Sequence, residues 1–182
     1  MAMWVFGYGS LMWDGWEKKF KGIRYEQAKL YHYHRAFNKK SIKNWGTPQN
    51  PGPTLGLEPE EGAKCIGCAF EFPDDQCQAV LSYLKEREGP SFKIEKLKVV
   101  LKDGRTIRAY TSVNDRTAST YIGNLSLEER ARMAINASGT SGNCLDYVLQ
   151  LHKKLKELGI IDPYVEEFLK VIESIRGVSE SR

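Results

Sequence analysis

Three short stretches of the sequence carry residues whose types and spacing could do chemistry. The first is Gly-Tyr-Gly-Ser, residues 7–10, which directly follows the apolar residues Trp4, Val5 and Phe6. Glycines after a buried strand let the backbone turn and let a ligand come close, and N–H groups exposed in such a turn form an anion-binding nest. The hydroxyl of Ser10 adds a hydrogen-bond donor. A bulge or a barrel corner explains the same glycines without a ligand, so this stretch alone leaves both interpretations open.

The glycine pattern matches neither of two common phosphate-binding motifs. It lacks the Gly-x-x-x-x-Gly-Lys-Ser/Thr sequence of a P-loop. It also lacks the third glycine of Gly-x-Gly-x-x-Gly, because Met12 stands at that position. The sequence therefore gives no support to a nucleotide cofactor.

The second stretch is Tyr-Leu-Lys-Glu-Arg-Glu-Gly, residues 83–89. Glu88 is expected in the last turn of a helix, just before Gly89, where the partial negative charge of the helix C-terminus disfavours a carboxylate. A carboxylate that is also partly buried there would have a raised pKa, which is the condition for a general acid–base catalyst. Charged residues at a helix end are more often solvated, and that interpretation is favoured for Glu86.

The third stretch runs from Ala137 to Tyr147 and holds two glycines. These glycines predict a turn between two helices, and Ser141 or Asn143 could cap the second helix. Tyr147 then falls in the first turn of that helix. A simple joint between helices, with Tyr147 in the core, is the favoured interpretation of this stretch taken alone.

Other catalytic constellations find no support in the sequence. One Cys-x-x-Cys pair is present, but a structural zinc site needs a second pair or histidines at ligand spacing. His32 and His34 lack that spacing, and His152 lies far along the chain. A Gly-x-Ser-x-Gly elbow is also missing. We therefore expect no metal, and we expect reduced thiols, as in a cytosol, at the four cysteines: Cys65, Cys68, Cys77 and Cys144.

Composition indicates an ordinary globular protein. The 182 residues suit a single domain, residues 1–182, with 41% hydrophobic and 27% charged residues. The net charge of +4 is too small, and the lysines too scattered, to predict a nucleic-acid partner. No apolar run is long enough to cross a membrane, and the N-terminus does not resemble a signal peptide. We expect a soluble cytoplasmic protein with no membrane partner, and the sequence leaves its oligomeric state open.

Strand patterns dominate the first part of the chain. Residues 4–7 and the alternating, aromatic-rich residues 22–37 predict strands. Residues 38–62 contain four prolines and four glycines, so they predict a long loop, with 54–57 as a short strand. A loop of this length is often functional, although an irregular surface crossing explains it equally well. Residues 65–72 predict another strand.

The remaining elements carry explicit start and stop signals. A helix is expected to begin at an Asp74 cap and to end at Gly89, and Asp103-Gly104 predicts a hairpin between two strands. A capping box at Ser126 predicts a helix up to Asn136. Residues 145–158 form an amphipathic helix pattern, and a last helix is predicted to start at Asp162-Pro163 and end near Gly177. This order, with helices gathered toward the C-terminus, predicts an α+β fold.

Taken together and in this order, the three stretches resemble the γ-glutamylcyclotransferase superfamily, and specifically its ChaC-like branch. The residues that carry the resemblance are Trp-Val-Phe-Gly-Tyr-Gly-Ser-Leu-Met-Trp at 4–13, the Arg-Glu helix end at 87–88, and the block at 137–148. Arg-Ala-Phe-Asn-Lys-Lys-Ser at 35–41 and Pro-Gly-Pro-Thr-Leu-Gly-Leu at 51–57 fit the intervening region. The similarity extends over residues 4–151, which is most of the chain.

The resemblance implies a mixed β-barrel with flanking helices and a reaction without a cofactor. A γ-glutamyl compound loses its γ-linked amine and closes to 5-oxoproline; in this branch the usual substrate is glutathione, and Cys-Gly is the second product. Carried over to this chain, Glu88 matches the catalytic glutamate. The expected substrate-binding residues are Val5, Phe6, Gly7, Tyr8, Gly9, Ser10, Leu11 and Tyr147.

Two departures from the family pattern leave the substrate open. Asn44-Trp45 stands where ChaC-like enzymes often carry His-Arg, so other γ-glutamyl amino acids or γ-glutamylamines become plausible substrates. Pro90-Ser91 stands where the family is glycine-rich, which affects the expected shape of the pocket rim. A non-catalytic module that binds a small molecule is the alternative of a different class, because it would keep the glycine turn without needing Glu88.

Overall fold

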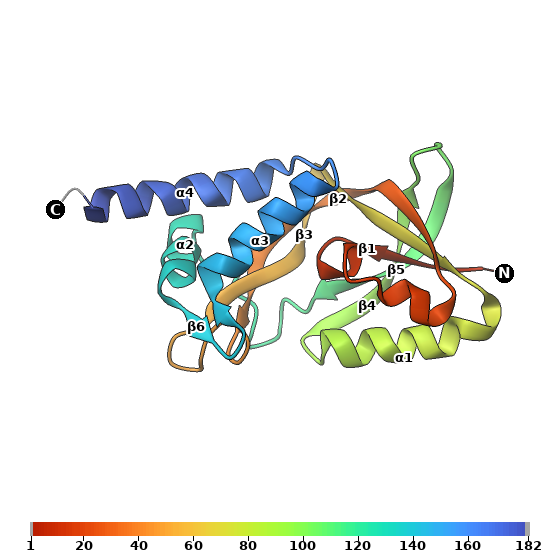
Figure 1. The fold of residues 1–182 in the computed structure, drawn as a ribbon, viewed down its shortest axis with the longest axis horizontal. Helices are drawn as coiled ribbons and strands as arrows, with labels where there is room; N and C mark the ends of the chain where they lie inside the picture. The colour runs from red at the N-terminus through yellow and green to blue at the C-terminus, as the bar shows by residue number, and fades with distance from the viewer. Residues whose placement is uncertain (1, 181–182) are drawn as a thin grey trace. The chain divides into compact units, whose positions relative to one another are not determined.

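The computed structural model describes residues 2–180 of the chain. The chain divides into two compact units, and Figure 1 shows their elements. The first unit comprises Met1–His34 and Pro59–Asp115, and the second comprises Arg35–Glu58 and Arg116–Arg182. The order of elements is strands, one helix, a hairpin and then three helices, which confirms the predicted α+β class.

Five strands form a closed barrel in the order β1-β3-β2-β4-β5. Barrel closure depends on β1, which pairs antiparallel with β3 from Met3↔Phe72 to Gly7↔Cys68 and makes one parallel bridge to β5 at Val5↔Tyr110. Closure removes the free edges that an open sheet would expose. The strands are β1 (Met3–Gly7), β2 (Ile23–Ser41), β3 (Gly52–Phe72), β4 (Phe92–Val100) and β5 (Thr106–Asn114).

The hairpin between β4 and β5 is confirmed. Its strands pair continuously from Phe92↔Asn114 to Val100↔Thr106. Gly104 in the connecting turn has φ +89°, a conformation that glycine adopts without steric cost. The predicted turn residues therefore set the register of this antiparallel pair.

The prediction of a long loop over residues 38–62 is wrong. β2 continues to Ser41 and β3 begins at Gly52, so only residues 42–51 connect them. Most of the prolines and glycines that suggested a loop (Gly52, Pro53, Gly56, Pro59 and Gly62) lie inside β3, where Leu55 and Leu57 are buried. Gly52 is a close-approach position, because a Cβ there would overlap the carbonyl oxygen of Trp45. Tertiary contact, and not turn formation, accounts for this glycine.

The helix α1 (Cys77–Glu88) belongs to the first unit and buries Val80 and Leu84. Its predicted start is wrong: Asp74–Gln76 forms a 3-10 turn, and Gln76 precedes α1 without a side-chain cap. Its predicted end is confirmed, because Gly89 has φ +75° and its N–H donates to the carbonyl of Lys85. A core aromatic cluster consists of Trp16, Phe20, Phe70, Phe72 and Tyr83.

Three helices belong to the second unit: α2 (Leu127–Asn136), α3 (Cys144–Glu157) and α4 (Pro163–Glu180). Figure 1 shows α2 beside α3 and α4, and α2 packs against both. The predicted capping box is confirmed by a bond from the Glu129 N–H to Ser126 Oγ (3.1 Å) and one from the Ser126 N–H to Glu129 Oε2 (2.7 Å). A two-stranded hairpin, β6 (Ser138–Gly139) and β7 (Gly142–Asn143), joins α2 to α3. Within residues 2–180, no helix is both long enough and apolar enough to cross a membrane.

The start of α4 is fixed by a buried ion pair. Asp162 Oδ1 accepts hydrogen bonds from the N–H groups of Tyr164 (3.0 Å) and Val165 (3.2 Å). Its other oxygen lies 2.7 Å from Arg35 Nη1, with side chains 4% and 0% exposed. The predicted stop near Gly177 is wrong, because α4 continues to Glu180. A glycine inside a helix costs about 1 kcal/mol, which neighbouring turns can outweigh.

Candidate active site

β1 and the turn after it hold all the predicted binding residues except Tyr147. Gly7 ends the strand, and Ser10–Met12 forms a single 3-10 turn. A Cβ on Gly7 would lie 2.9 Å from Leu11 Cβ and 3.2 Å from Phe70 Cε2. The chain therefore folds back so tightly that only glycine fits at this position. Val5, Phe6, Tyr8 and Leu11 are buried, whereas Ser10 is exposed.

Side chains of β5 hold the end of β1 after the single bridge at Val5. Thr111 Oγ1 donates a hydrogen bond to the carbonyl of Phe6 (3.0 Å). The hydroxyl of Tyr8, buried in the unit, donates to the carbonyl of Ser112 (2.9 Å) and lies 3.2 Å from Ser112 Oγ. Tyr8 therefore anchors the turn to β5 through its side chain. A ligand contact by Tyr8 would come from its backbone.

Backbone donors of the turn are left available. The N–H groups of Met12 and Trp13 donate to the carbonyls of Gly9 (2.9 Å) and Ser10 (3.1 Å). Within residues 2–180, the N–H groups of Gly9, Ser10 and Leu11 have no hydrogen-bond acceptor. Successive N–H groups in a turn carry partial positive charge and bind carboxylate or developing oxyanion oxygens.

The last turn of α1 is tied to this turn by Arg87. Its Nη2 donates to Ser10 Oγ (2.7 Å), and its Nη1 donates to the hydroxyl of Tyr83 (3.0 Å) and forms an ion pair with Asp14. Burial lowers the pKa of Arg87, but the hydrogen bonds to Asp14 and Tyr83 outweigh it and raise the pKa above its usual value. The guanidinium therefore stays charged.

Glu88 follows Arg87 and is the final residue of α1. It is half-buried, whereas Glu86 in the same turn is exposed. This difference in exposure agrees with the separate expectations for the two carboxylates. The catalytic role of Glu88 stays a prediction.

Tyr147 lies in the second unit, on α3. Its hydroxyl accepts a hydrogen bond from the N–H of Leu55 in β3 (3.0 Å). Its ring packs against Trp45 (centroids 5.1 Å apart) and edge-on against Phe37 (6.5 Å). The side chain therefore braces β3 in its own unit, and its role in substrate binding stays a prediction.

The atypical Asn44-Trp45 segment is held by the third sequence block. The N–H groups of Thr140 and Ser141 donate to the carbonyls of Lys43 and Asn44 (both 2.8 Å). Gly139 is required here, because a Cβ on it would overlap the Lys43 carbonyl. Asn143 occupies the N-cap position of α3 but makes no side-chain cap, so the predicted capping by Asn143 or Ser141 is wrong.

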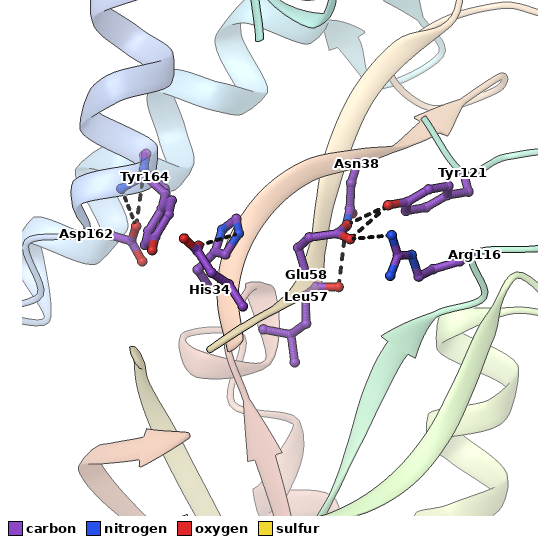
Figure 2. A network of polar contacts seen from close by, with 10 residues as sticks. His34, Asn38, Leu57, Glu58, Arg116, Tyr121, Asp162 and Tyr164 are labelled. Atoms are coloured by element: carbon purple, nitrogen blue, oxygen red, sulfur yellow. Dashed lines mark hydrogen bonds and ion pairs between the residues drawn. The ribbon is translucent and has the colours of Figure 1, made fainter. Parts of the chain in front are cut away.

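Sequence reasoning missed a cluster of polar side chains around one carboxylate, Glu58, in the second unit. Figure 2 shows Tyr121, Asn38 and Arg116 converging on Glu58. The Tyr121 hydroxyl lies 2.8 and 2.9 Å from the two carboxylate oxygens, Asn38 Nδ2 donates at 2.8 Å, and Arg116 Nη2 lies 3.6 Å away. Burial and the bond to Glu58 raise the pKa of Tyr121, so Tyr121 remains a donor at neutral pH. No sequence signal distinguishes Glu58 from its acidic neighbours, because Tyr121 is 63 residues away.

The thiols and possible metal ligands are dispersed. None of the four cysteines, which all lie in the described residues, forms a disulfide, and Cys65, Cys68 and Cys144 are buried. Burial raises the pKa of Cys144 to about 12, so this thiol is protonated at neutral pH. In the described part of the chain, no three His, Cys, Asp or Glu side chains are grouped to hold a metal ion.

Comparison with known proteins decides the family. The model of the ChaC-like protein family matches residues 3–175. The chain belongs to the ChaC-like family. This ChaC-like chain is 30% identical over 192 residues to γ-glutamylcyclotransferase 2-3 of Arabidopsis thaliana, with 99% of this chain and 93% of the relative covered. It is 28% identical over 178 residues to the glutathione-specific γ-glutamylcyclotransferase of Escherichia coli, covering 95% and 74%.

The fold of this ChaC-like chain also matches a solved structure. A crystal structure of the yeast γ-glutamylcyclotransferase specific to glutathione superimposes with a TM-score of 0.82 at 20% sequence identity. The match covers 95% of this chain and 96% of the yeast chain. It confirms the expected family fold, a barrel with flanking helices.

Proposed function

We propose that this ChaC-like chain is a γ-glutamylcyclotransferase that acts on glutathione, producing 5-oxoproline and Cys-Gly. The relatives named as γ-glutamylcyclotransferases support the reaction, and the glutathione-specific name of the Escherichia coli relative supports the substrate. The structural observation that carries the proposal is the hydrogen bond between Arg87 and Ser10, which joins a donor-rich turn to the helix end that bears Glu88.

The reaction needs protons to pass from the attacking amine to the leaving amine, and it needs no other reagent. The α-amine nitrogen of the substrate attacks its own γ-carbonyl carbon, and the amide bond to cysteine breaks. The ammonium group loses one proton before it attacks and a second as its nitrogen becomes the lactam N–H, and the leaving amine nitrogen gains these two protons. One carboxylate placed beside the reacting atoms can do both. We assign both roles to Glu88, which is half-buried at the end of α1.

We assign binding of the γ-glutamyl group to the turn after β1. Its three free N–H groups, at Gly9, Ser10 and Leu11, suit either the α-carboxylate or the oxygen that gains charge as the ring closes. Holding the glutamyl chain folded is itself a large contribution, because an extended chain cannot cyclise. Substrate contact by Val5, Phe6, Gly7, Tyr8 and Tyr147 remains part of the proposal.

We infer that the two units act as one domain located in the cytoplasm. The family model spans both units, from residue 3 to residue 175, which supports a single domain. Four cysteines without a disulfide among the described residues fit a reducing compartment. We expect a small-molecule substrate, as the names of the relatives support, and no nucleic-acid or membrane partner.

The test is 5-oxoproline release from glutathione, γ-glutamyl dipeptides and a γ-glutamylamine, with the wild type, Glu88→Gln and Glu86→Gln. Loss of a general acid–base group costs about 10²–10⁴-fold in kcat, so we expect that loss in Glu88→Gln with the fold retained. Glu86→Gln is the matched control, because Glu86 lies in the same helical turn and is exposed. It should behave as the wild type.

Each alternative has its own outcome. Release from a γ-glutamyl dipeptide or amine, but not from glutathione, would move the substrate to that compound and direct attention to the Asn44-Trp45 segment. Equal activity of Glu88→Gln and Glu86→Gln would remove Glu88 from the mechanism. A folded wild type that releases nothing would leave a binding module as the function.

A further inference from the structure

Both terminal nitrogens of the Arg87 guanidinium are held by polar contacts. It donates to Ser10 Oγ at 2.7 Å, donates to the Tyr83 hydroxyl at 3.0 Å and pairs with Asp14. We propose that Arg87 is a positioning residue whose guanidinium fixes Ser10 as a hydrogen-bond acceptor, so that the Ser10 hydroxyl proton is directed to an oxygen of the γ-glutamyl substrate. This inference rests on the proposed function.

The polarity of the Arg87–Ser10 bond follows from chemistry. A guanidinium has five N–H donors and no acceptor, so Ser10 Oγ must accept. A serine hydroxyl carries one proton, and accepting through a lone pair leaves that proton to be donated elsewhere. Ser10 is exposed and donates to no residue in the described chain. Its proton is therefore available in the turn that also presents the free N–H groups.

The guanidinium is itself held by a rigid aromatic stack. Its central carbon lies 5.9 Å from the centre of the Tyr83 ring. The Tyr83 ring is stacked on Trp16, with centroids 5.5 Å apart and planes 5° from parallel. Trp16 is 1% exposed and packs among the core aromatic residues. The core thus fixes the tyrosine, and the tyrosine and Asp14 together fix the direction of the arginine fork.

This geometry requires arginine and not only a positive charge. Three acceptors, at Ser10, Asp14 and Tyr83, lie around one planar fork. An ammonium group is a single point with rotating donors and cannot hold all three acceptors in the same arrangement. Lysine at position 87 would therefore keep the charge but lose the fixed orientation of Ser10.

A double-mutant cycle tests the inference with glutathione as the substrate. The variants are Arg87→Met, Ser10→Ala and the double variant, with kcat, KM and melting temperature measured for each. Loss of one preorganised donor costs on the order of 10²-fold, so each single variant should lose about that much in kcat/KM. Since Arg87 acts through Ser10, Arg87→Met should cost at least about tenfold less in the Ser10→Ala background, within the coupling range for residues in contact.

Arg105→Met is the matched control. Arg105 also pairs with a carboxylate, Asp103 at 2.8 Å, and also lies over a tyrosine ring, Tyr25 at 5.5 Å. It makes no hydrogen bond or ion pair with Ser10–Met12, and we expect wild-type kcat/KM. Arg87→Lys provides a charge-preserving variant that tests the geometry even where Arg87→Met fails to fold.

Three results would overturn the inference. Additive effects of Arg87→Met and Ser10→Ala would mean that Arg87 does not act through Ser10. Full activity in Arg87→Lys would mean that charge alone is sufficient. Activity of Arg87→Met equal to that of Arg105→Met would mean that the contact has no catalytic consequence. These outcomes require an active wild type, so they differ from failure of the proposed function, in which the wild type releases no 5-oxoproline.

Discussion

Gly7→Ala should damage both stability and activity, because the turn after β1 has no room for a methyl group. The added Cβ would lie 2.9 Å from Leu11 Cβ and 3.2 Å from Phe70 Cε2. A Cβ is fixed to the backbone and cannot rotate away, so residues 7–11 must shift. Gly7 does not have a positive φ, so the cost comes from the contacts alone.

The magnitude follows from the size of the overlap. Overpacking of a tight site costs about 1–3 kcal/mol. In a chain of this length, each kcal/mol lowers the melting temperature by about 2–4 °C, so we expect a fall of roughly 2–12 °C. Because a displacement on the order of 1 Å in a positioning element can cost about 10²-fold, kcat/KM for glutathione should fall by about that factor.

Thermal unfolding and 5-oxoproline release measure the two effects. Gly177→Ala is the matched control, because a Cβ on Gly177 meets nothing within 4 Å and the residue lies in α4. That substitution should stabilise the protein by up to about 1 kcal/mol and leave activity unchanged. A Gly7→Ala variant with wild-type melting temperature and wild-type kcat/KM would refute the reasoning, since the turn would then have spare room.

Two further predictions concern the second unit. Asp162→Asn should lower the free energy of unfolding in denaturant by about 3–5 kcal/mol, because it leaves the buried Arg35 charge without its carboxylate; Asp162→Ala should cost about 1 kcal/mol more by also removing the cap of α4. A loss below ~1 kcal/mol in Asp162→Asn would show that Arg35 does not depend on this pair. Burial raises the pKa of the Cys144 thiol from 9.0 to about 12, so the unfolded state loses its proton first as pH rises. The contribution of this thiol to the free energy of unfolding is fully present below pH 9 and is lost toward pH 12. Above pH 9, the free energy of unfolding of the wild type should therefore fall by about 1.4 kcal/mol per pH unit more than that of Cys144→Ala. Parallel plots of unfolding free energy against pH for the two proteins would contradict this.

Signals with partners close in sequence could be predicted. The hairpin turn at Asp103-Gly104, the stop at Gly89 and the capping box at Ser126 all involve groups within five residues of one another. Such local hydrogen bonds depend on residue types and spacing, which the sequence shows directly. The failed prediction of a loop over residues 38–62 shows the limit, because residues 52–62 belong to β3, which pairs with strands elsewhere in the chain.

The same distinction between partners close in sequence and partners far apart applies to the candidate site. The sequence by itself determined the glycine turn after β1, the position of a glutamate at a helix end, and the resemblance to a family, whereas the half-burial of Glu88 came from the structure. Only the tertiary structure decided that Arg87 reaches Ser10 across 77 residues, that the Tyr8 hydroxyl is taken by Ser112, and that Glu58 is held by Tyr121. The physical reason is that these bonds depend on how strands and helices pack. Residue types and their spacing do not show which distant residue packing will bring into contact.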